Sequence, residues 1–251
     1  MTATAVSTST FSAPVAWDEP EGIAPRGTLL VLPGRGDSPA AYGRFGRRLS
    51  TDAYKVRVVE VALDDLATTK AHLEQLLADE ELPSPKVLVG TDTGAAIAAT
   101  LVEDLAVDAV VLAGLVLPSG DRAEPADWDA ELEARSACPA HRRVITEDDE
   151  FQRGALTQPV PESLVPVATT KPVLVVHGSA DPVTLAADAF DLYRHSPRAQ
   201  LRLVTGGRHD VLNDLSHRSV AATVVLFLER LKLGEDAPAI VSAPLNAGKA
   251  S

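Results

Sequence analysis

Short apolar runs alternate with longer amphipathic segments along most of this 251-residue chain. The runs, which we interpret as strands, are 28–32, 56–61, 87–89, 107–112, 173–176 and 201–204. Apolar residues at helical spacing mark the segments 63–80, 95–105, 186–194 and 211–233. Apolar strands separated by helices are typical of a parallel sheet that is covered on both faces. The pattern therefore predicts an α/β protein with a doubly wound, mostly parallel sheet.

Three stretches depart from this alternation. Residues 1–10 are mainly Ser, Thr and Ala, and residues 234–251 lack sustained periodicity, so we expect a loose leader and a loose tail. Residues 119–170 are polar and contain several prolines, with helices expected near 128–136 and 145–153. Because this stretch lies between two core strands, we interpret it as a cap inserted into a core of residues 11–118 and 171–233.

The charge and the cysteine content exclude several classes of protein. The formal net charge is −12, which repels nucleic acid and anionic membrane surfaces. The single cysteine, Cys138, rules out an intramolecular disulfide and fits a reducing compartment. The N-terminal residues lack the features of a secretory signal, and no apolar run reaches the roughly 20 residues of a membrane span. We expect a soluble, cytoplasmic protein that acts on a small molecule.

A glycine-flanked turn joins the strand at 87–89 to the helical segment that follows. Residues 87–96 read VLVGTDTGAA, so Gly90 and Gly94 flank Asp92. In a nucleophile elbow, small residues let strand and helix approach while the central side chain projects into a pocket. The sequence therefore places Asp92 where such turns carry their nucleophile, although glycines also flank many ordinary strand-to-helix turns.

Two further polar residues each follow a predicted strand. Asp181 lies in HGSADPV (177–183), and His209 lies in GGRHDVLND (206–214). The carboxyl ends of parallel strands share one edge of a sheet, so Asp181 and His209 are candidates to meet Asp92 there. Taken alone, Asp181 could instead cap the next helix, and His209 could be an inert loop residue. Their order along the chain favours a shared site, because nucleophile, acid and histidine each follow a strand of their own.

This order of residues resembles the α/β-hydrolase superfamily from about residue 27 to residue 233. The segment GRHDVLND (207–214) is most similar to the monoacylglycerol-lipase and lysophospholipase-like branch. The resemblance implies that Asp181 orients His209 and that Asp92 occupies the nucleophile position, which usually carries serine. It also implies an oxyanion hole in the loop LPGRGDS (32–38), with the backbone N–H groups of Arg35 and Thr93 as donors.

An aspartate at the elbow leaves three hypotheses open. A carboxylate that attacks an sp³ carbon forms an alkyl ester, which favours opening an epoxide or displacing a halide. Against this, the cap contains no tyrosine to assist an epoxide, and Thr93 stands where dehalogenases of this fold place a tryptophan. The main hypothesis is a hydrolase with an Asp92–His209–Asp181 triad, in which Asp92 is the nucleophile or a base for water. The alternatives are an ester or thioester hydrolase in which aspartate replaces serine, and a non-hydrolytic ligand-binding protein.

Other motifs give no further site. No histidine or cysteine spacing matches zinc, and the full G-x-G-x-x-G pattern of dinucleotide binding is absent from the sequence. We therefore expect neither a metal nor a cofactor. His177 is interpreted as a packed residue at a strand end. The sequence does not identify the substrate or the oligomeric state.

Overall fold

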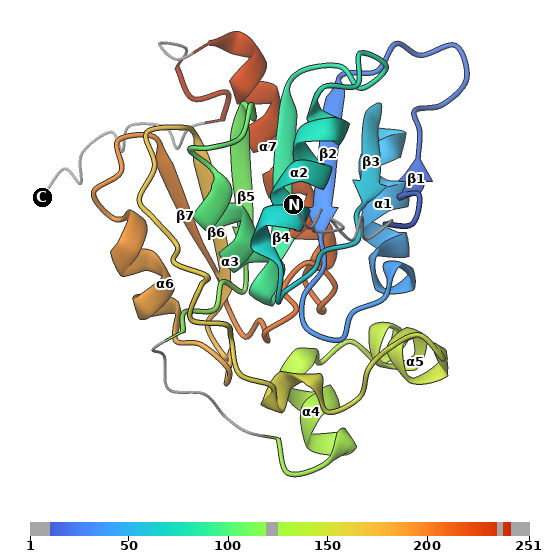
Figure 1. Ribbon diagram of the computed structural model, residues 1–251, viewed down its shortest axis with the longest axis vertical. Helices are drawn as coiled ribbons and strands as arrows, with labels where there is room; N and C mark the ends of the chain where they lie inside the picture. Colours follow the sequence, from blue (N-terminus) through green and yellow to red (C-terminus); the bar gives the residue numbers. More distant parts are fainter. Residues whose placement is uncertain (1–10, 119–124, 235–237, 242–251) are drawn as a thin grey trace, which may run out of the picture.

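A computed structural model describes residues 11–118, 125–234 and 238–241 (Figure 1). Seven strands form one sheet in the order β1-β3-β2-β4-β5-β6-β7, with β1 antiparallel to β3 and every other pair parallel. This confirms the predicted doubly wound, mostly parallel sheet. The strands are β1 Val15–Trp17, β2 Gly27–Leu32, β3 Tyr54–Val58, β4 Lys86–Thr91, β5 Ala109–Ala113, β6 Val173–Gly178 and β7 Ala199–Val204.

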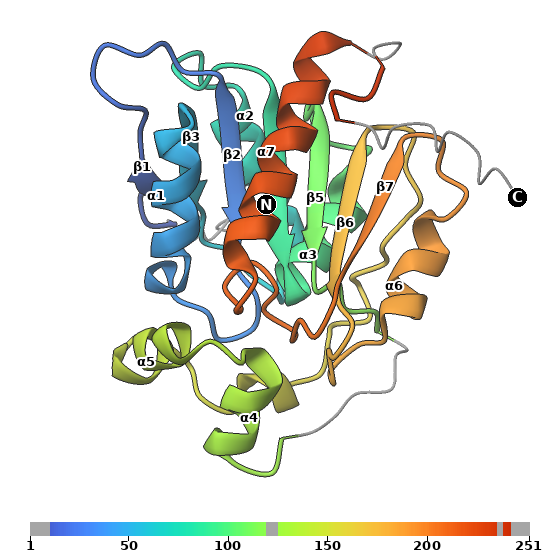
Figure 2. The ribbon, with the colours of Figure 1, turned by 180° about the vertical axis from the view of Figure 1, so that it is seen from behind.

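Helices cover both faces of the sheet (Figures 1 and 2). One face is covered by α1 (Gly43–Thr51) and α7 (His217–Leu233), the other by α2 (Leu66–Leu77), α3 (Asp92–Leu101) and α6 (Ala186–Tyr193). Alternate residues of β2 serve the two layers: Leu29 and Val31 pack in the α1–α7 layer, and Leu30 and Leu32 pack in the α2–α3–α6 layer. The strands β2, β5 and β6 are buried at every position, whereas the edge strands β1 and β7 are partly exposed.

Several element boundaries differ from those predicted. The edge strand β1 and the helix α1 were not predicted, because β1 has only three residues and α1 (GRFGRRLST) is rich in arginine and glycine. The last helix begins at His217 instead of residue 211, since residues 211–216 form turns. The helix α3 begins at Asp92, three residues before the predicted residue 95, and β3 ends at Val58 instead of residue 61.

The part of the predicted cap that the structure describes, residues 125–170, is called the cap segment below. It contains α4 (Trp128–Arg135), α5 (Pro139–Glu147) and the short 3₁₀ helix η2 (Ala155–Thr157), and it lies across the carboxyl edge of the sheet (Figure 1). The helix predicted at 145–153 lies earlier, because Pro139 occupies the first turn of α5, where its fixed φ suits a helix start. Residues 119–124, the predicted leader and most of the predicted tail lie outside the described residues.

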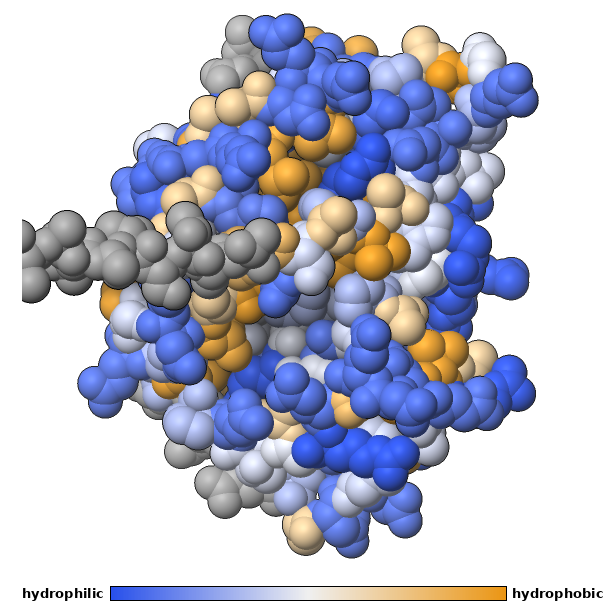
Figure 3. All heavy atoms as spheres, turned by 45° about the vertical axis from the view of Figure 1, so that its right-hand side comes forward, coloured by the Kyte–Doolittle hydropathy of each residue, from blue (hydrophilic) through white to orange (hydrophobic). Residues whose placement is uncertain are grey.

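The surface agrees with the charge of the chain. The face shown in Figure 3 carries mostly hydrophilic side chains, and its apolar side chains form separate patches. Among the helices of the described residues, none is both long and apolar enough to cross a membrane.

Candidate active site

The turn between β4 and α3 is a sharp elbow centred on Asp92. Asp92 has φ 49°, a left-handed conformation that a non-glycine residue rarely adopts. A Cβ atom at Gly90 would lie 2.4 Å from the Cα of Ala95, and one at Gly94 would lie 2.1 Å from the carbonyl oxygen of Leu32. Only glycine fits these two positions, so both flanking glycines are required for the strand and the helix to approach.

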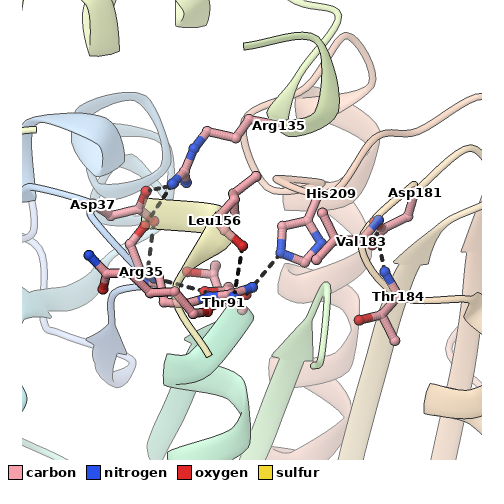
Figure 4. A network of polar contacts seen from close by, with 12 residues as sticks. Arg35, Asp37, Thr91, Arg135, Leu156, Asp181, Val183, Thr184 and His209 are labelled. Atoms are coloured by element: carbon pink, nitrogen blue, oxygen red, sulfur yellow. Dashed lines mark hydrogen bonds and ion pairs between the residues drawn. The ribbon is translucent and has the colours of Figure 1, made fainter. Parts of the chain in front are cut away.

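The loops after β6 and β7 bring Asp181 and His209 to the elbow. The Nδ1 atom of His209 lies 2.8 Å from Asp181 Oδ2, and its Nε2 atom lies 3.1 Å from Asp92 Oδ1. Asp181 Oδ1 accepts the backbone N–H groups of Val183 and Thr184, so the carboxylate of Asp181 is held in place (Figure 4). The three residues singled out in the sequence therefore form one line, with His209 between two carboxylates.

Arg35 occupies the other side of the Asp92 carboxylate. Its backbone N–H and its Nε atom each donate to Asp92 Oδ2 at 2.8 Å, and its Nη2 atom donates to Oδ1 at 2.7 Å. With the contact from His209, Asp92 has four hydrogen bonds, two on each oxygen. A carboxylate offers about four such positions in total, so no lone pair of Asp92 remains free in this arrangement.

Arg35 also ties the elbow to the cap segment. Its Nη1 atom donates to the carbonyl oxygens of Leu156 at 3.1 Å and Gln158 at 2.7 Å. Arg135 of α4 reinforces this junction, because its guanidinium donates to the carbonyl of Arg35 and to Asp37 (Figure 4). Arg135 also binds Glu131 within α4.

The cap segment closes the site from solvent. The backbone N–H groups of His209 and Asp210 donate to the carbonyls of Ala134 and Arg135 in α4. Asp92 is 4% exposed and His209 is 3% exposed. A cavity of about 790 Å³ lies elsewhere and is lined by residues such as Lys171, Pro172 and Phe227. In this arrangement, little of the Asp92 carboxylate is therefore open to a substrate.

Opposing effects set the charges in this line of residues. Burial raises the pKa of Asp92, but Arg35 and His209 outweigh burial and hold that pKa well below its usual range. Burial lowers the pKa of His209, yet Asp181 and Asp92 more than compensate and raise it to about 10. The pKa of Asp181 is likewise lowered, because His209 and His177 oppose the effect of burial. At neutral pH the site thus holds two carboxylates, an imidazolium and a guanidinium.

The two residues expected to form the oxyanion hole lie at the elbow. The backbone N–H of Arg35 is bonded to Asp92 itself, so in this arrangement it is not available to a substrate oxygen. Thr93 lies in the first turn of α3, where backbone N–H groups lack partners within the helix. Its buried Oγ1 atom also has no hydrogen-bond partner among the described residues.

The roles of three polar side chains at the site were not predicted from the sequence. For Arg35 the sequence predicted a role only for the backbone N–H, Arg135 was not predicted at all, and His177 was predicted to be a packed residue. A basic residue inside a glycine loop after the first core strand was the available signal for Arg35. Arg135 gave no signal, since i,i+4 pairs such as Glu131–Arg135 are usually exposed on helices.

Solved structures of two lipases and an esterase share this architecture. A monoacylglycerol lipase of Paleococcus ferrophilus superposes with a TM-score of 0.70 at 15% identity, covering 88% of this chain and 99% of that one. A soluble variant of the monoglyceride lipase of Saccharomyces cerevisiae gives 0.70 at 16%, covering 87% and 91%. The chain has the α/β-hydrolase fold.

A third neighbour with this fold is an esterase of Exiguobacterium antarcticum, with a TM-score of 0.61 at 17% identity over 88% of this chain and 99% of that one. No protein-family profile matches the sequence, and no curated protein matches it either. The likeness to lipases and esterases is therefore one of fold. Within the α/β-hydrolase fold, the elbow at Asp92 and the loops of Asp181 and His209 stand at the carboxyl edge of the sheet, where such folds bind ligands.

Proposed function

We propose that this chain is a hydrolase that acts on an sp³ carbon of a small organic substrate, with an epoxide as the substrate class that the site suits best. The observation that carries the proposal is the line Asp92–His209–Asp181 at 3.1 and 2.8 Å. The carboxylate of Asp92 is ionised, so it needs no base before it attacks. The imidazolium of His209 supplies the proton that an opening epoxide ring requires.

The reaction balances in two steps. First, an oxygen of Asp92 forms a bond to a ring carbon, the carbon–oxygen bond of the ring breaks, and the ring oxygen takes the Nε2 proton of His209. The product is an alkyl ester on Asp92 and a neutral His209. Second, His209 removes a proton from water, the water oxygen attacks the ester carbonyl, and the diol leaves. Asp92 returns to its carboxylate and His209 to its imidazolium.

Electrostatics favour this change of role for His209. While Asp92 is ionised, its charge stabilises the imidazolium. Once Asp92 is esterified, that charge is gone, so the pKa of His209 falls and the imidazole becomes a competent base. Asp181 holds Nδ1 throughout and keeps Nε2 directed at the elbow.

Turnover requires Arg35 to move. Both oxygens of Asp92 are occupied by Arg35, and Arg35 is bonded to the cap segment through Leu156 and Gln158. Displacement of the cap segment would withdraw the guanidinium and expose the carboxylate together. We infer that the described arrangement is the closed state of the enzyme.

A second candidate function is supported by the same ion pair. A carboxylate with four hydrogen bonds, 4% exposed, is a poor nucleophile for as long as Arg35 stays in place. If Arg35 does not leave, the protein is a non-hydrolytic member of the fold that uses a charged core to hold its cap segment. Such a protein would be stabilised by a ligand without converting it.

The experiment is a panel of small epoxides and p-nitrophenyl esters tested with wild type, Asp92→Asn and His209→Ala. Turnover of epoxides by wild type, with both variants silent, supports the proposal. Turnover of esters alone would favour an ester hydrolase with aspartate in place of serine. Thermal stabilisation by panel members without turnover, in all three proteins, would overturn the hydrolase and favour the second candidate.

A further inference from the structure

His177 lies directly behind Asp181 and is fully buried at the end of β6. Its Nε2 atom is 2.9 Å from Asp181 Oδ2, the same oxygen that His209 contacts. The same Nε2 atom is 2.9 Å from the carbonyl oxygen of Thr184. Asp181 is therefore placed between two imidazoles.

These contacts close a small ring. The backbone N–H of Thr184 donates to Asp181 Oδ1, the carbonyl of Thr184 accepts from His177, and His177 lies against Asp181 Oδ2. The Nε2 atom of His177 is therefore shared between the carbonyl of Thr184 and the carboxylate of Asp181. With His177 in place, the carboxylate of Asp181 cannot rotate without losing contacts on both of its oxygens.

The surroundings of His177 identify its tautomer. Both atoms near Nε2 are acceptors, so Nε2 carries a proton. The buried Nδ1 atom has no hydrogen-bond partner among the described residues, so a second proton there would be unsatisfied. The ring is oriented by an edge contact with Phe190, with 6.3 Å between the ring centroids.

We propose that His177 is a positioning residue that acts through Asp181 to hold His209 in its working orientation. That His209 acts in catalysis rests on the proposed function, but the placement of His209 can be measured without any turnover. The polar contacts of His177 in the described structure are to Thr184 and Asp181, not to Asp92. It shares the negative charge of Asp181 with His209 and prevents the carboxylate from turning away.

Besides His177, several charged groups influence His209, and the measurement must distinguish their effects from that of His177. Asp181 and Asp92 face its two nitrogens, and Arg35 stands behind Asp92. Asp37 and Arg135 act on Asp92 at longer range. A change at His177 leaves all of these in place, so its effect on His209 passes through Asp181.

The test is ¹H–¹⁵N NMR of the imidazole groups at pH 7 in the full chain. In wild type, the Nδ1 proton of His209 should resonate far downfield and exchange slowly with water. In His177→Asn the amide is too short to reach Asp181. This variant should lack the resonance, or its proton should exchange with water at least ten times faster. His177→Gln, whose amide nitrogen can take the place of Nε2, should retain it. Phe190→Leu is the matched control, because it disturbs the packing of the ring but leaves the hydrogen-bond donor.

The outcomes are distinct. Loss in His177→Asn with retention in His177→Gln and Phe190→Leu supports the proposal, whatever the substrate panel gives. An unchanged resonance in a folded His177→Asn, or equal loss in Phe190→Leu, overturns it. If an epoxide is turned over, His177→Asn should lower kcat with little change in KM. In a protein that already carries Asp181→Asn, adding His177→Asn should not lower kcat further, because the two residues act as a unit.

Discussion

Arg35 surrounds the carboxylate of Asp92 with three of its own N–H groups, one from the backbone and two from the guanidinium. Both side chains are buried, with 0% and 4% exposure. A buried ion pair of this kind is costly to break, because removing one partner leaves an uncompensated charge. Asp92 is therefore both a candidate nucleophile and, through Arg35, connected to the cap segment.

Removing one member of this pair should cost more stability than removing both. We expect Arg35→Leu to lower the free energy of unfolding by about 3–5 kcal/mol, because Asp92 stays buried and loses its guanidinium partner. Arg35→Leu combined with Asp92→Leu should recover most of this loss. Urea unfolding of the two single variants and the double variant measures the coupling. Additive losses would show that the two side chains do not stabilise each other.

The stability of the protein should fall at alkaline pH because of His209. Its pKa is raised to about 10 in the folded chain from an ordinary value of 6.5. The stabilisation from its charge is therefore complete below pH 6.5 and is lost as the pH rises towards 10, at about 1.4 kcal/mol for each tenfold change in proton affinity. Urea unfolding between pH 6 and 10 should show this decline in wild type. A decline of equal size in His209→Asn would exclude His209 as its source.

Gly94 should tolerate no side chain. A Cβ atom there would lie 2.1 Å from the carbonyl of Leu32, so Gly94→Ala should cost about 3 kcal/mol or more, at the upper end of overpacking effects. Gly22→Ala is the control: nothing lies within 4 Å of its Cβ position, and its φ of +79° should cost only about 1–2 kcal/mol. Thermal unfolding compares them, and equal losses would argue against a tight elbow.

Arg135 should hold the cap segment closed. Arg135→Met removes the partner of Asp37 and Glu131 and the hydrogen bond to the carbonyl of Arg35. We expect faster hydrogen exchange at the backbone amides of His209 and Asp210, which are bonded to α4. The exposed Arg153→Met is a suitable control within the same segment. Unchanged exchange at both amides in Arg135→Met would mean that other contacts close the site.

The sequence was sufficient to predict six of the seven strands, because each of them contains an apolar run, but not the three-residue edge strand β1. It also predicted that Asp92, Asp181 and His209 lie together, since residues that follow parallel strands meet at one edge of the sheet. It did not predict the role of the Arg35 side chain, whose two hydrogen bonds to Asp92 reach a residue 57 positions away. Nor did it predict His177 beside Asp181, because a buried histidine at a strand end looks the same whether or not it has a polar partner.

In the proposed reaction Asp92 forms a covalent ester, and the direct test of this step uses water labelled with ¹⁸O. Wild type is incubated with an epoxide from the panel for many turnovers in H₂¹⁸O, and the peptide that contains Asp92 is then analysed by mass spectrometry. We expect ¹⁸O in the carboxylate of Asp92, because hydrolysis of the ester replaces an oxygen of the enzyme with one from water. A labelled diol with an unlabelled Asp92 would contradict it and would show that water attacks the substrate directly.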